Sequence, residues 1–534
     1  MSENPRGGAM DLVVVGGGPR ALYALADLDE ELARSAPEAQ ARPFRVTILE
    51  TGRLGAGAVW EPGQPAHLMM NVDSRIVDAT CPSVPLTFQQ WQGSGGEVFP
   101  SRAQVGRYLA WSFERLRESA RLEVIHRPVR ATAVRREGLS WVCETVDAAG
   151  KGAASERSPR VMLATGHTGG PGIDHAAVAD ASRGPCPGAP VVVRGASLTA
   201  FDVVMDLTAG RGGSWVADAT VDWGLRYVPG GSEPSSITML SRSGEPMLPK
   251  PVSLPAAVVA AVRDRTSAWS SESNPDDEWW DVLAAGAEAA ALASGTRVTR
   301  EELWARLDGV LADGPDARWA RDVRRALGDV DSDCAWWWGR AWAAGYADVV
   351  RSLERAPRDP ALWSRWRARA ATLERWAFGP PLVTHRRLLA LRESGILRVV
   401  RGSSPAQMES GVEVIDAFTR GPGIRDAVRG KGGTAPEEGR EPWEGLLADG
   451  HVSVRPGERG ALTASDGTCV GPGGDLSVGL AALGRPTEDP VIGHDSLQRR
   501  LHGDSSRWAR AVATTWLADR GVESAQLTKV GTDD

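Results

Sequence analysis

Residues 11–27 read DLVVVGGGPRALYALAD and combine an apolar strand, a turn of glycines and the beginning of a helix. A βαβ dinucleotide-binding unit requires these parts in this order. Gly16 can make the tight turn, Gly18 leaves room for a pyrophosphate beside the backbone, and Ala21 permits close packing of helix on strand. The free N–H groups and the positive dipole end of the helix would face the phosphates. The stretch therefore predicts a dinucleotide bound at the first strand–helix crossover.

A second apolar strand, RVTILE at residues 45–50, supplies the acid that usually accompanies such a turn. Glu50 ends this strand, where a carboxylate can accept hydrogen bonds from an adenosine ribose. It follows the glycines by more than the usual spacing of about twenty residues, which we attribute to a polar insertion over residues 35–43. Because strand, helix and acid occur in order, the pattern favours a functional site over a chance cluster of glycines.

The overall composition points to a small-molecule partner. The formal net charge is −7, whereas nucleic acids and anionic membranes require a dense basic face. The five cysteines are scattered without the spacing of a metal or redox motif, which is typical of reduced thiols. No signal-peptide core and no apolar run of about eighteen residues is evident. We therefore expect a soluble cytoplasmic protein, bound to neither nucleic acid nor membrane, and without a metal site.

The chain of 534 residues exceeds what one hydrophobic core usually organises. We expect an α/β fold with two Rossmann-like dinucleotide-binding domains, the second inserted in the first, and an additional helical insertion. An apolar strand that again turns into a helix at residues 190–202, and a tryptophan-rich run with helical spacing, support this organisation. The expected parts are residues 1–185 and 443–534 for the first domain, 186–253 and 381–442 for the second, including a mobile polar loop at 421–442, and 254–380 for the helical insertion.

The second crossover carries an imperfect fingerprint. Gly195 keeps the first turn glycine, but Ser197 stands where the middle glycine usually lies, and its Cβ would crowd a pyrophosphate. An ordinary strand-to-helix turn is therefore the alternative interpretation. Arg242, at the end of the strand that follows, favours a nucleotide because a ribose 2′-phosphate attracts a guanidinium. Arg242 would then select NADPH over NADH.

Other polar residues have both a functional and a structural interpretation. His494 could relay protons with Asp495, although a His–Asp pair more often has only a structural role. Arg102 could reach a buried phosphate or lie on the surface, and the tryptophans could line a substrate pocket or fill a core. The chain contains no nucleophile-elbow serine and no phosphate-binding Gly-Lys-Ser/Thr motif. Covalent acyl transfer and nucleotide hydrolysis are thereby excluded.

The chain resembles a bacterial FAD/NAD(P)-binding flavoprotein family in VGGGPR at 15–20, LMMN at 68–71, FPSR at 99–102, LATG at 163–166 and VRGASLTAFD at 193–202. This family is related to N-hydroxylating and other class B flavin monooxygenases. The resemblance implies that NADPH reduces FAD, that O₂ adds at flavin C4a, and that the hydroperoxyflavin passes oxygen to a nucleophilic atom. An amine or amino acid is the implied substrate. Ser197 departs from the usual glycine of the family.

The resemblance also implies which residues contact each cofactor. The FAD contacts are expected at Gly16, Gly18, Pro19, Arg20, Glu50, Arg102, Val129, Thr165, Gly166 and Gly484, with Met70, Asn71 and His494 as candidates that line the ring. The NADPH contacts are expected at Gly195, Ser197, Thr199 and Arg242.

The sequence thus predicts an FAD-dependent, NADPH-using monooxygenase that N-hydroxylates an amine or amino acid with O₂. One alternative is a flavin oxidase or dehydrogenase that its substrate reduces directly, without a nicotinamide. Another is a non-catalytic flavin-binding protein that uses the tryptophan-rich helices as an interaction face. A homodimer is one assembly compatible with each of these interpretations.

Overall fold

The computed structural model describes residues 10–35, 42–166, 173–251, 254–267, 278–309, 315–327, 333–402, 412–418, 421–424 and 442–520. Its strands are β1 (Leu12–Val15), β2 (Phe44–Leu49), β3 (Leu122–Arg127), β4 (Arg130–Glu137), β5 (Ser140–Val146), β6 (Glu156–Ser158), β7 (Val161–Leu163), β8 (Pro190–Arg194), β9 (Ser214–Ala217), β10 (Leu225–Val228), β11 (Ser236–Ser241), β12 (Leu397–Arg401), β13 (Glu413–Asp416), β14 (Thr468–Val470) and β15 (Leu476–Ala482).

The helices are α1 (Pro19–Ser35), α2 (Phe88–Gln92), α3 (Arg102–Arg117), α4 (His175–Ala179), α5 (Leu198–Thr208), α6 (Ala256–Thr266), α7 (Glu278–Ala293), α8 (Arg300–Asp308), α9 (Pro315–Leu327), α10 (Cys334–Leu353), α11 (Pro360–Ala377), α12 (Leu382–Glu393), α14 (Pro442–Ala448) and α15 (Asp504–Ala518). The α/β class expected from the sequence is confirmed. Most of the polar stretch at 421–442, expected to be a mobile loop, lies outside the described residues.

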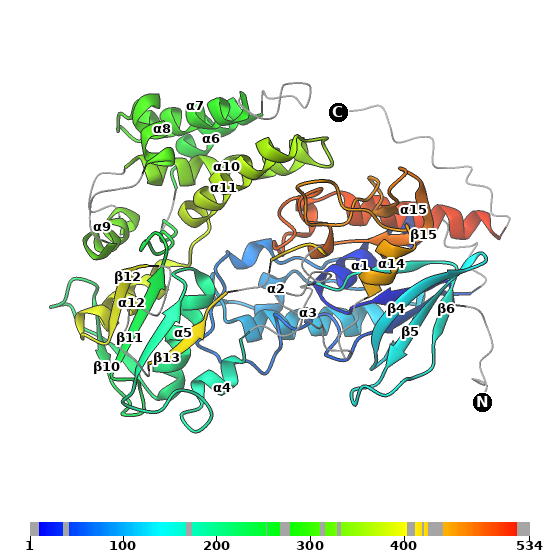
Figure 1. Cartoon of the computed structure of the whole chain (residues 1–534), viewed down its shortest axis with the longest axis horizontal. Coiled ribbons are helices and arrows are strands. Elements are labelled where there is room, and N and C mark those ends of the chain that lie inside the picture. Colours follow the sequence, from blue (N-terminus) through cyan, green and yellow to red (C-terminus); the bar gives the residue numbers. More distant parts are fainter. Residues whose placement is uncertain are drawn as a thin grey trace.

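Two main sheets organise the chain (Figure 1). A six-stranded mixed sheet has the order β14-β15-β7-β1-β2-β3, in which only the β14–β15 pair is antiparallel. A four-stranded sheet, β12-β11-β8-β13, is entirely parallel. In sequence, the strands of the parallel sheet fall between β7 and β14 of the mixed sheet. β1 is a run of buried Leu and Val, as expected of a central parallel strand covered on both faces.

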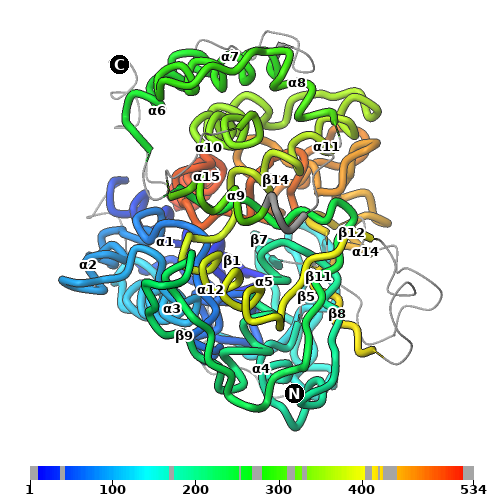
Figure 2. Tube along the Cα trace, turned by 90° about the vertical axis from the view of Figure 1, so that its left-hand side faces the viewer, coloured from blue at the N-terminus to red at the C-terminus, as the bar shows by residue number. Residues whose placement is uncertain are grey.

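Helices α6 to α11 follow β11 and precede α12 and β12 in the chain. α6, α7, α8, α10 and α11 lie together on one side of the molecule, above the four-stranded sheet (Figures 1 and 2). Their shared core contains stacked tryptophans such as Trp280 and Trp342, whose ring centroids are 6.1 Å apart at an interplanar angle of 8°. Within the described part of the chain, none of the large exposed hydrophobic side chains is a tryptophan. These tryptophans therefore fill a core rather than an aromatic surface patch.

Candidate functional site

The first crossover turns at Gly16, directly after β1. Its N–H donates to the Leu49 carbonyl over 3.0 Å, and its φ of +95° lies in the left-handed region. A Cβ at Gly16 would lie 2.4 Å from the carbonyl oxygen of Ala164, at the end of β7. Only glycine fits this turn, because a side chain would collide with a neighbouring backbone and strain its own.

Gly18 lies at the N-terminus of α1 and, unlike Gly16, has room for a side-chain atom. The nearest atom to a Cβ at this position would be the Gly57 Cα, at 3.7 Å, an ordinary van der Waals contact. The first turn of α1, which starts at Pro19, contains no acidic residue. The positive end of the helix therefore faces a space in which an anion can lie, and the residues here fit a dinucleotide pyrophosphate.

Glu50 ties the first crossover to the end of β2. Its Oε2 accepts a hydrogen bond from the Gly17 N–H over 2.9 Å, and its Oε1 accepts one from the Gly52 N–H over 2.8 Å. The carboxylate thus holds the glycine turn in place. The carboxylate oxygens have further lone pairs, with which they could also accept bonds from a ribose.

Three other expected FAD contacts follow strands of the six-stranded sheet. Thr165 follows β7, and its Oγ1 accepts a hydrogen bond from the indole N–H of Trp443 over 3.3 Å, with Gly166 next in the chain. Val129 is half-buried in the turn between β3 and β4. β7 neighbours β1 in the sheet, so Thr165 and Gly166 extend from the strand end beside Gly16.

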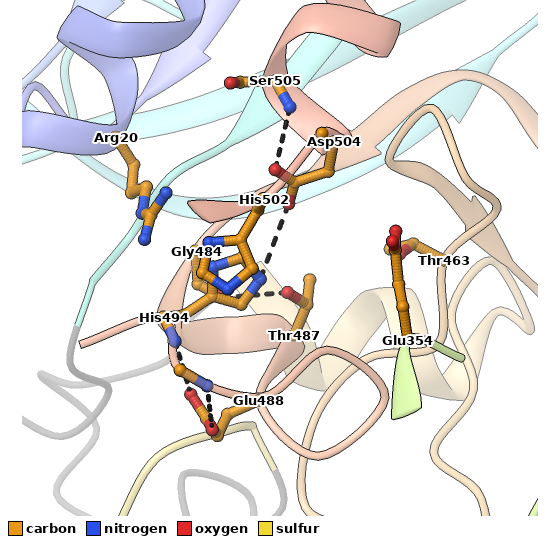
Figure 3. Close-up of polar contacts among 12 residues, drawn as sticks. Arg20, Glu354, Thr463, Gly484, Thr487, Glu488, His494, His502, Asp504 and Ser505 are labelled. Atoms are coloured by element: carbon orange, nitrogen blue, oxygen red, sulfur yellow. Dashed lines mark hydrogen bonds and ion pairs between the residues drawn. The ribbon is translucent and has the colours of Figure 1, made fainter. Parts of the chain in front are cut away.

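Arg20, Gly484 and His494 come together although they are far apart in sequence (Figure 3). A Cβ on Gly484, which follows β15, would lie 2.7 Å from Arg20 Cγ, and Arg20 donates to the Ser496 carbonyl over 3.1 Å. The His494 ring stacks on His502 with centroids 4.2 Å apart. The His494 ring pairs with Asp504, whose Oδ2 lies 3.5 Å from Nε2, and among the described ion pairs it has none with the adjacent Asp495. Burial, the neighbouring His502 and nearby arginines hold the pKa of His494 well below its usual value.

A group of carboxylates beside this segment was not singled out from the sequence. Glu488 accepts hydrogen bonds from the backbone N–H groups of Gly493 and His494, and burial raises its pKa to about 7. Glu374 of α11 is accessible to solvent, yet desolvation by the surrounding protein, Asp495 and Glu488 raise its pKa to about 8. Only the fold brings α11 to this segment, so the sequence held no local signal for Glu374.

Met70 and Asn71 lie in the segment between β2 and α2. Met70 is fully buried, and its N–H donates to the Pro100 carbonyl over 2.8 Å. The Asn71 side chain donates to the Phe378 carbonyl over 3.3 Å, and the backbone carbonyl of Asn71 accepts a hydrogen bond from Lys250 Nζ. Burial, together with the Arg340 cation, lowers the pKa of Lys250 to about 8. Asn71 therefore lies where this loop meets the segments after β11 and α11.

The second crossover turns at Gly195 (φ +138°) into α5. Ser197 precedes the helix without capping it, and its Oγ accepts a hydrogen bond from Arg375 Nη1 of α11 over 2.8 Å. Thr199 lies half-buried in the first turn, and Arg242 is exposed at the end of β11. The positive charge of Arg242 contributes to the lowered pKa of Arg375, after the larger effect of desolvation. The N-terminus of α5 therefore has two guanidinium groups near it, and Arg375 was not expected from the sequence.

Arg102, the first residue of α3, points toward α5. Its Nη2 lies 2.6 Å from Oδ2 of Asp202. Arg102 thus connects the six-stranded sheet to the helix that follows β8. Its expected contact with FAD stays a prediction.

Comparison with known proteins agrees with the first crossover. Residues 13–168 match a protein-family model described as FAD-NAD(P)-binding. This segment is therefore similar to FAD-NAD(P)-binding domains. It contains both glycines of the first crossover, Glu50 and Arg102, whereas the four-stranded sheet lies outside the match.

Relatives match part of the chain. Nitrosuccinic acid synthase from Aspergillus oryzae is 31% identical over 258 residues, covering 42% of this chain and 38% of the relative. L-aspartate N-monooxygenase (nitrosuccinate-forming) from Streptomyces cremeus is 29% identical over 282 residues, covering 42% of this chain and 41% of the relative. The chain spans about two fifths of the length of these curated relatives. The solved structure of the ornithine N-hydroxylase of Kutzneria sp. 744 aligns with a TM-score of 0.48 at 15% identity, covering 95% of this chain and 100% of that chain.

Two features are absent from the described part of the chain. None of its helices combines the length and the apolar character needed to cross a membrane. Its His, Cys, Asp and Glu side chains form no group of three or more suited to hold a metal ion.

Proposed function

We propose that the protein is an FAD-dependent, NADPH-using monooxygenase that hydroxylates the amine nitrogen of a small amino acid with O₂. The observation that carries this proposal is the first crossover, a glycine turn within the segment that matches an FAD-NAD(P)-binding family model, with room for a side-chain atom at Gly18 and no acidic residue in the first turn of α1. The names of the relatives, an aspartate N-monooxygenase among them, support a nitrogen atom as the site of oxidation.

In this proposal the two sheets belong to domains that bind different cofactors. Residues 1–185 and 443–534 bind FAD, and residues 186–253 and 381–442 bind NADPH. Residues 254–380 form a helical part that covers the substrate. Support comes from the sequence order of the strands, because both sheets contain a parallel strand that turns at a glycine into a helix.

Bound FAD would accept a hydride from NADPH and activate O₂ for transfer to the substrate. The α1 N-terminus would hold its pyrophosphate, Glu50 its ribose, and the turn at Thr165 and Gly166 would pack beside it. Arg375 and Arg242 would hold the phosphates of NADPH at α5. The carboxylate of Asp495 would attract a protonated amine, and the approach of that cation would favour the ionised form of the neighbouring Glu374, whose pKa is about 8 without it.

A flavin oxidase that its substrate reduces directly is the second candidate. Ser197 favours it, because its hydroxyl is already held by Arg375 at the place where a pyrophosphate would approach α5. An NADPH-dependent enzyme requires Arg375 to exchange this bond for a bond to phosphate.

One experiment separates the two candidates. The purified yellow protein is mixed with NADPH in the absence of air, and the visible absorbance of the flavin is followed. Rapid bleaching supports the monooxygenase, whereas bleaching only by an organic substrate supports the oxidase. Readmission of air with candidate amino acids, and assay of the hydroxylamine, nitroso or nitro product, then identifies the oxidised atom. An NADPH-reduced enzyme that oxidises none of the amino acids and only a carbon or sulfur substrate would overturn N-hydroxylation.

A further inference from the structure

Helix α5 directs two carboxylates, one helical turn apart, toward the part of the chain that contains the first crossover. Asp202 lies 2.6 Å from the Arg102 guanidinium. Asp206 is bonded on both sides, with Oδ1 2.7 Å from His67 Nε2 and Oδ2 2.6 Å from His175 Nδ1. Asp206 is 0% exposed and Asp202 is 8% exposed. Buried carboxylates are costly unless they are paired, so these contacts fix where α5 can lie.

The partners come from three separate segments. His67 lies in the loop that continues to Met70 and Asn71, and Arg102 begins α3. His175 begins α4, in the connection from β7 of the six-stranded sheet to β8 of the four-stranded sheet. Asp206 therefore joins a loop of one sheet, a helix of the other sheet and the connection between them.

A small pocket lies against this group of side chains. His67, Asn71, Arg102, Asp202 and Thr384 are among its lining residues. The pocket joins the Met70–Asn71 loop to the face of α5. Because an α-helix rises about 1.5 Å per residue, Asp202 lies about 7 Å along α5 from the turn at Ser197.

We propose that Asp202 and Asp206, with His67, Arg102 and His175, are positioning residues that hold the nicotinamide-binding helix at a fixed distance from the flavin-binding loop. The inference rests on the proposed function. Hydride transfer requires the donor and acceptor carbons in near contact, and a displacement of 1 Å costs on the order of a hundredfold in rate. Residues that fix α5 against the 67–71 loop therefore control the rate of flavin reduction by NADPH, without touching either cofactor's reacting atoms.

The test compares variants in the FAD-loaded enzyme. His67→Ala removes the contact with Asp206, Asp202→Asn removes the negative charge that pairs with Arg102, and His67→Gln keeps an N–H that can reach Asp206. Asp222→Asn is the matched control, because Asp222 also forms a 2.6 Å pair with an arginine, Arg324, but on the surface with a side chain 61% exposed. Anaerobic flavin reduction is measured at saturating NADPH. Reoxidation by O₂ is measured separately after reduction with dithionite.

We expect His67→Ala and Asp202→Asn to slow reduction by NADPH about tenfold or more, with full flavin content and an unchanged reaction with O₂. His67→Gln and Asp222→Asn are expected to stay within about twofold of wild type, since exposed pairs contribute little. Equal rates in all variants would overturn the positioning role, as would a parallel loss of flavin content or of the reaction with O₂. A wild-type flavin that dithionite reduces and NADPH does not would instead overturn the proposed function, and this inference with it.

Discussion

The backbone at Gly16 and the carbonyl oxygen of Ala164 lie so close that a Cβ on Gly16 would be 2.4 Å from this oxygen. Gly18, two residues later, has no such neighbour: a Cβ there would meet only Gly57 Cα, at 3.7 Å. The two glycines of one motif therefore differ in purpose. Gly16 is required by the fold, whereas in the proposed function Gly18 leaves space for the FAD pyrophosphate.

This difference predicts separate effects for two substitutions. Gly16→Ala is expected to lower the free energy of unfolding by about 2 kcal/mol or more, because it combines a positive φ with a backbone collision. Gly18→Val is expected to change it by only about 1 kcal/mol but to yield colourless protein, since the side chain fills the pyrophosphate space. Chemical denaturation and the ratio of visible to ultraviolet absorbance measure the two effects. A yellow Gly18→Val protein with normal flavin content would contradict the assignment of the FAD site.

Glu50→Gln tests the carboxylate beneath the turn. Glu50 accepts hydrogen bonds from Gly17 and Gly52 through different oxygens, whereas a glutamine amide has only one oxygen. Its NH₂ group would face an N–H donor, and a lost hydrogen bond of this kind costs about 1–3 kcal/mol. We expect FAD to bind at least about tenfold more weakly, as measured by flavin titration of the apoprotein. Unchanged affinity would show that the turn does not depend on this acid.

Arg375→Gln tests the guanidinium that reaches the second crossover from α11. In the proposed function it contacts a phosphate of NADPH, so its removal should raise the NADPH concentration for half-maximal flavin reduction by about tenfold or more. FAD content should stay at the wild-type level, because Arg375 lies at α5 and not at α1. Arg369→Gln is the control, since Arg369 lies on the same helix and pairs with Asp308 instead. Equal NADPH dependence in both variants would remove Arg375 from the site.

The sequence predicted local units well and contacts between distant segments poorly. Apolar runs followed by glycine at residues 12–18 and 190–195 indicate strands that turn into helices, and the structure has β1–α1 and β8–α5 there. The pair Ser197–Arg375 joins residues 178 positions apart, and no periodicity records such a contact. His494 illustrates the same limit. Its neighbour in sequence is Asp495, but the backbone direction brings Asp504 to its ring.

Trp342 tests whether the tryptophan-rich helices form a packed core. Its side chain is fully buried and packs against the rings of both Trp280 and Trp366. Trp342→Ala is expected to lower the free energy of unfolding by about 3–5 kcal/mol, through lost burial and a cavity. Leu139→Ala, at a residue 89% exposed, should change it by less than about 0.5 kcal/mol. Urea denaturation checks both, and a Trp342→Ala protein as stable as wild type would contradict the packing described.

The lowered pKa of His502 predicts that the protein loses stability in acid. Burial, followed by the Arg20 charge, lowers its pKa from 6.5 to about 4, and its Nε2 donates to the Ile492 carbonyl over 2.8 Å. Between these pH values the unfolded chain binds a proton that the folded protein does not, so the contribution of His502 is present above pH 6.5 and lost as the pH falls through 4. Glu488 has the opposite effect on stability. Its pKa is raised to about 7, so as the pH falls through 7 the folded protein binds a proton that the unfolded chain does not yet bind, and the free energy of unfolding increases.

The comparison of wild type with His502→Gln isolates the histidine from Glu488. Glutamine keeps an N–H donor for the Ile492 carbonyl and does not titrate. The measured quantity is the free energy of unfolding of His502→Gln minus that of wild type. This difference should be about 2–3 kcal/mol more favourable to the variant at pH 4.5 than at pH 7.5, because at pH 4.5 folding of wild type requires His502 to lose a proton that it holds in the unfolded chain. Urea denaturation at the two pH values gives this difference directly. The same difference at both pH values would show that His502 takes up its proton equally well in the folded and unfolded protein.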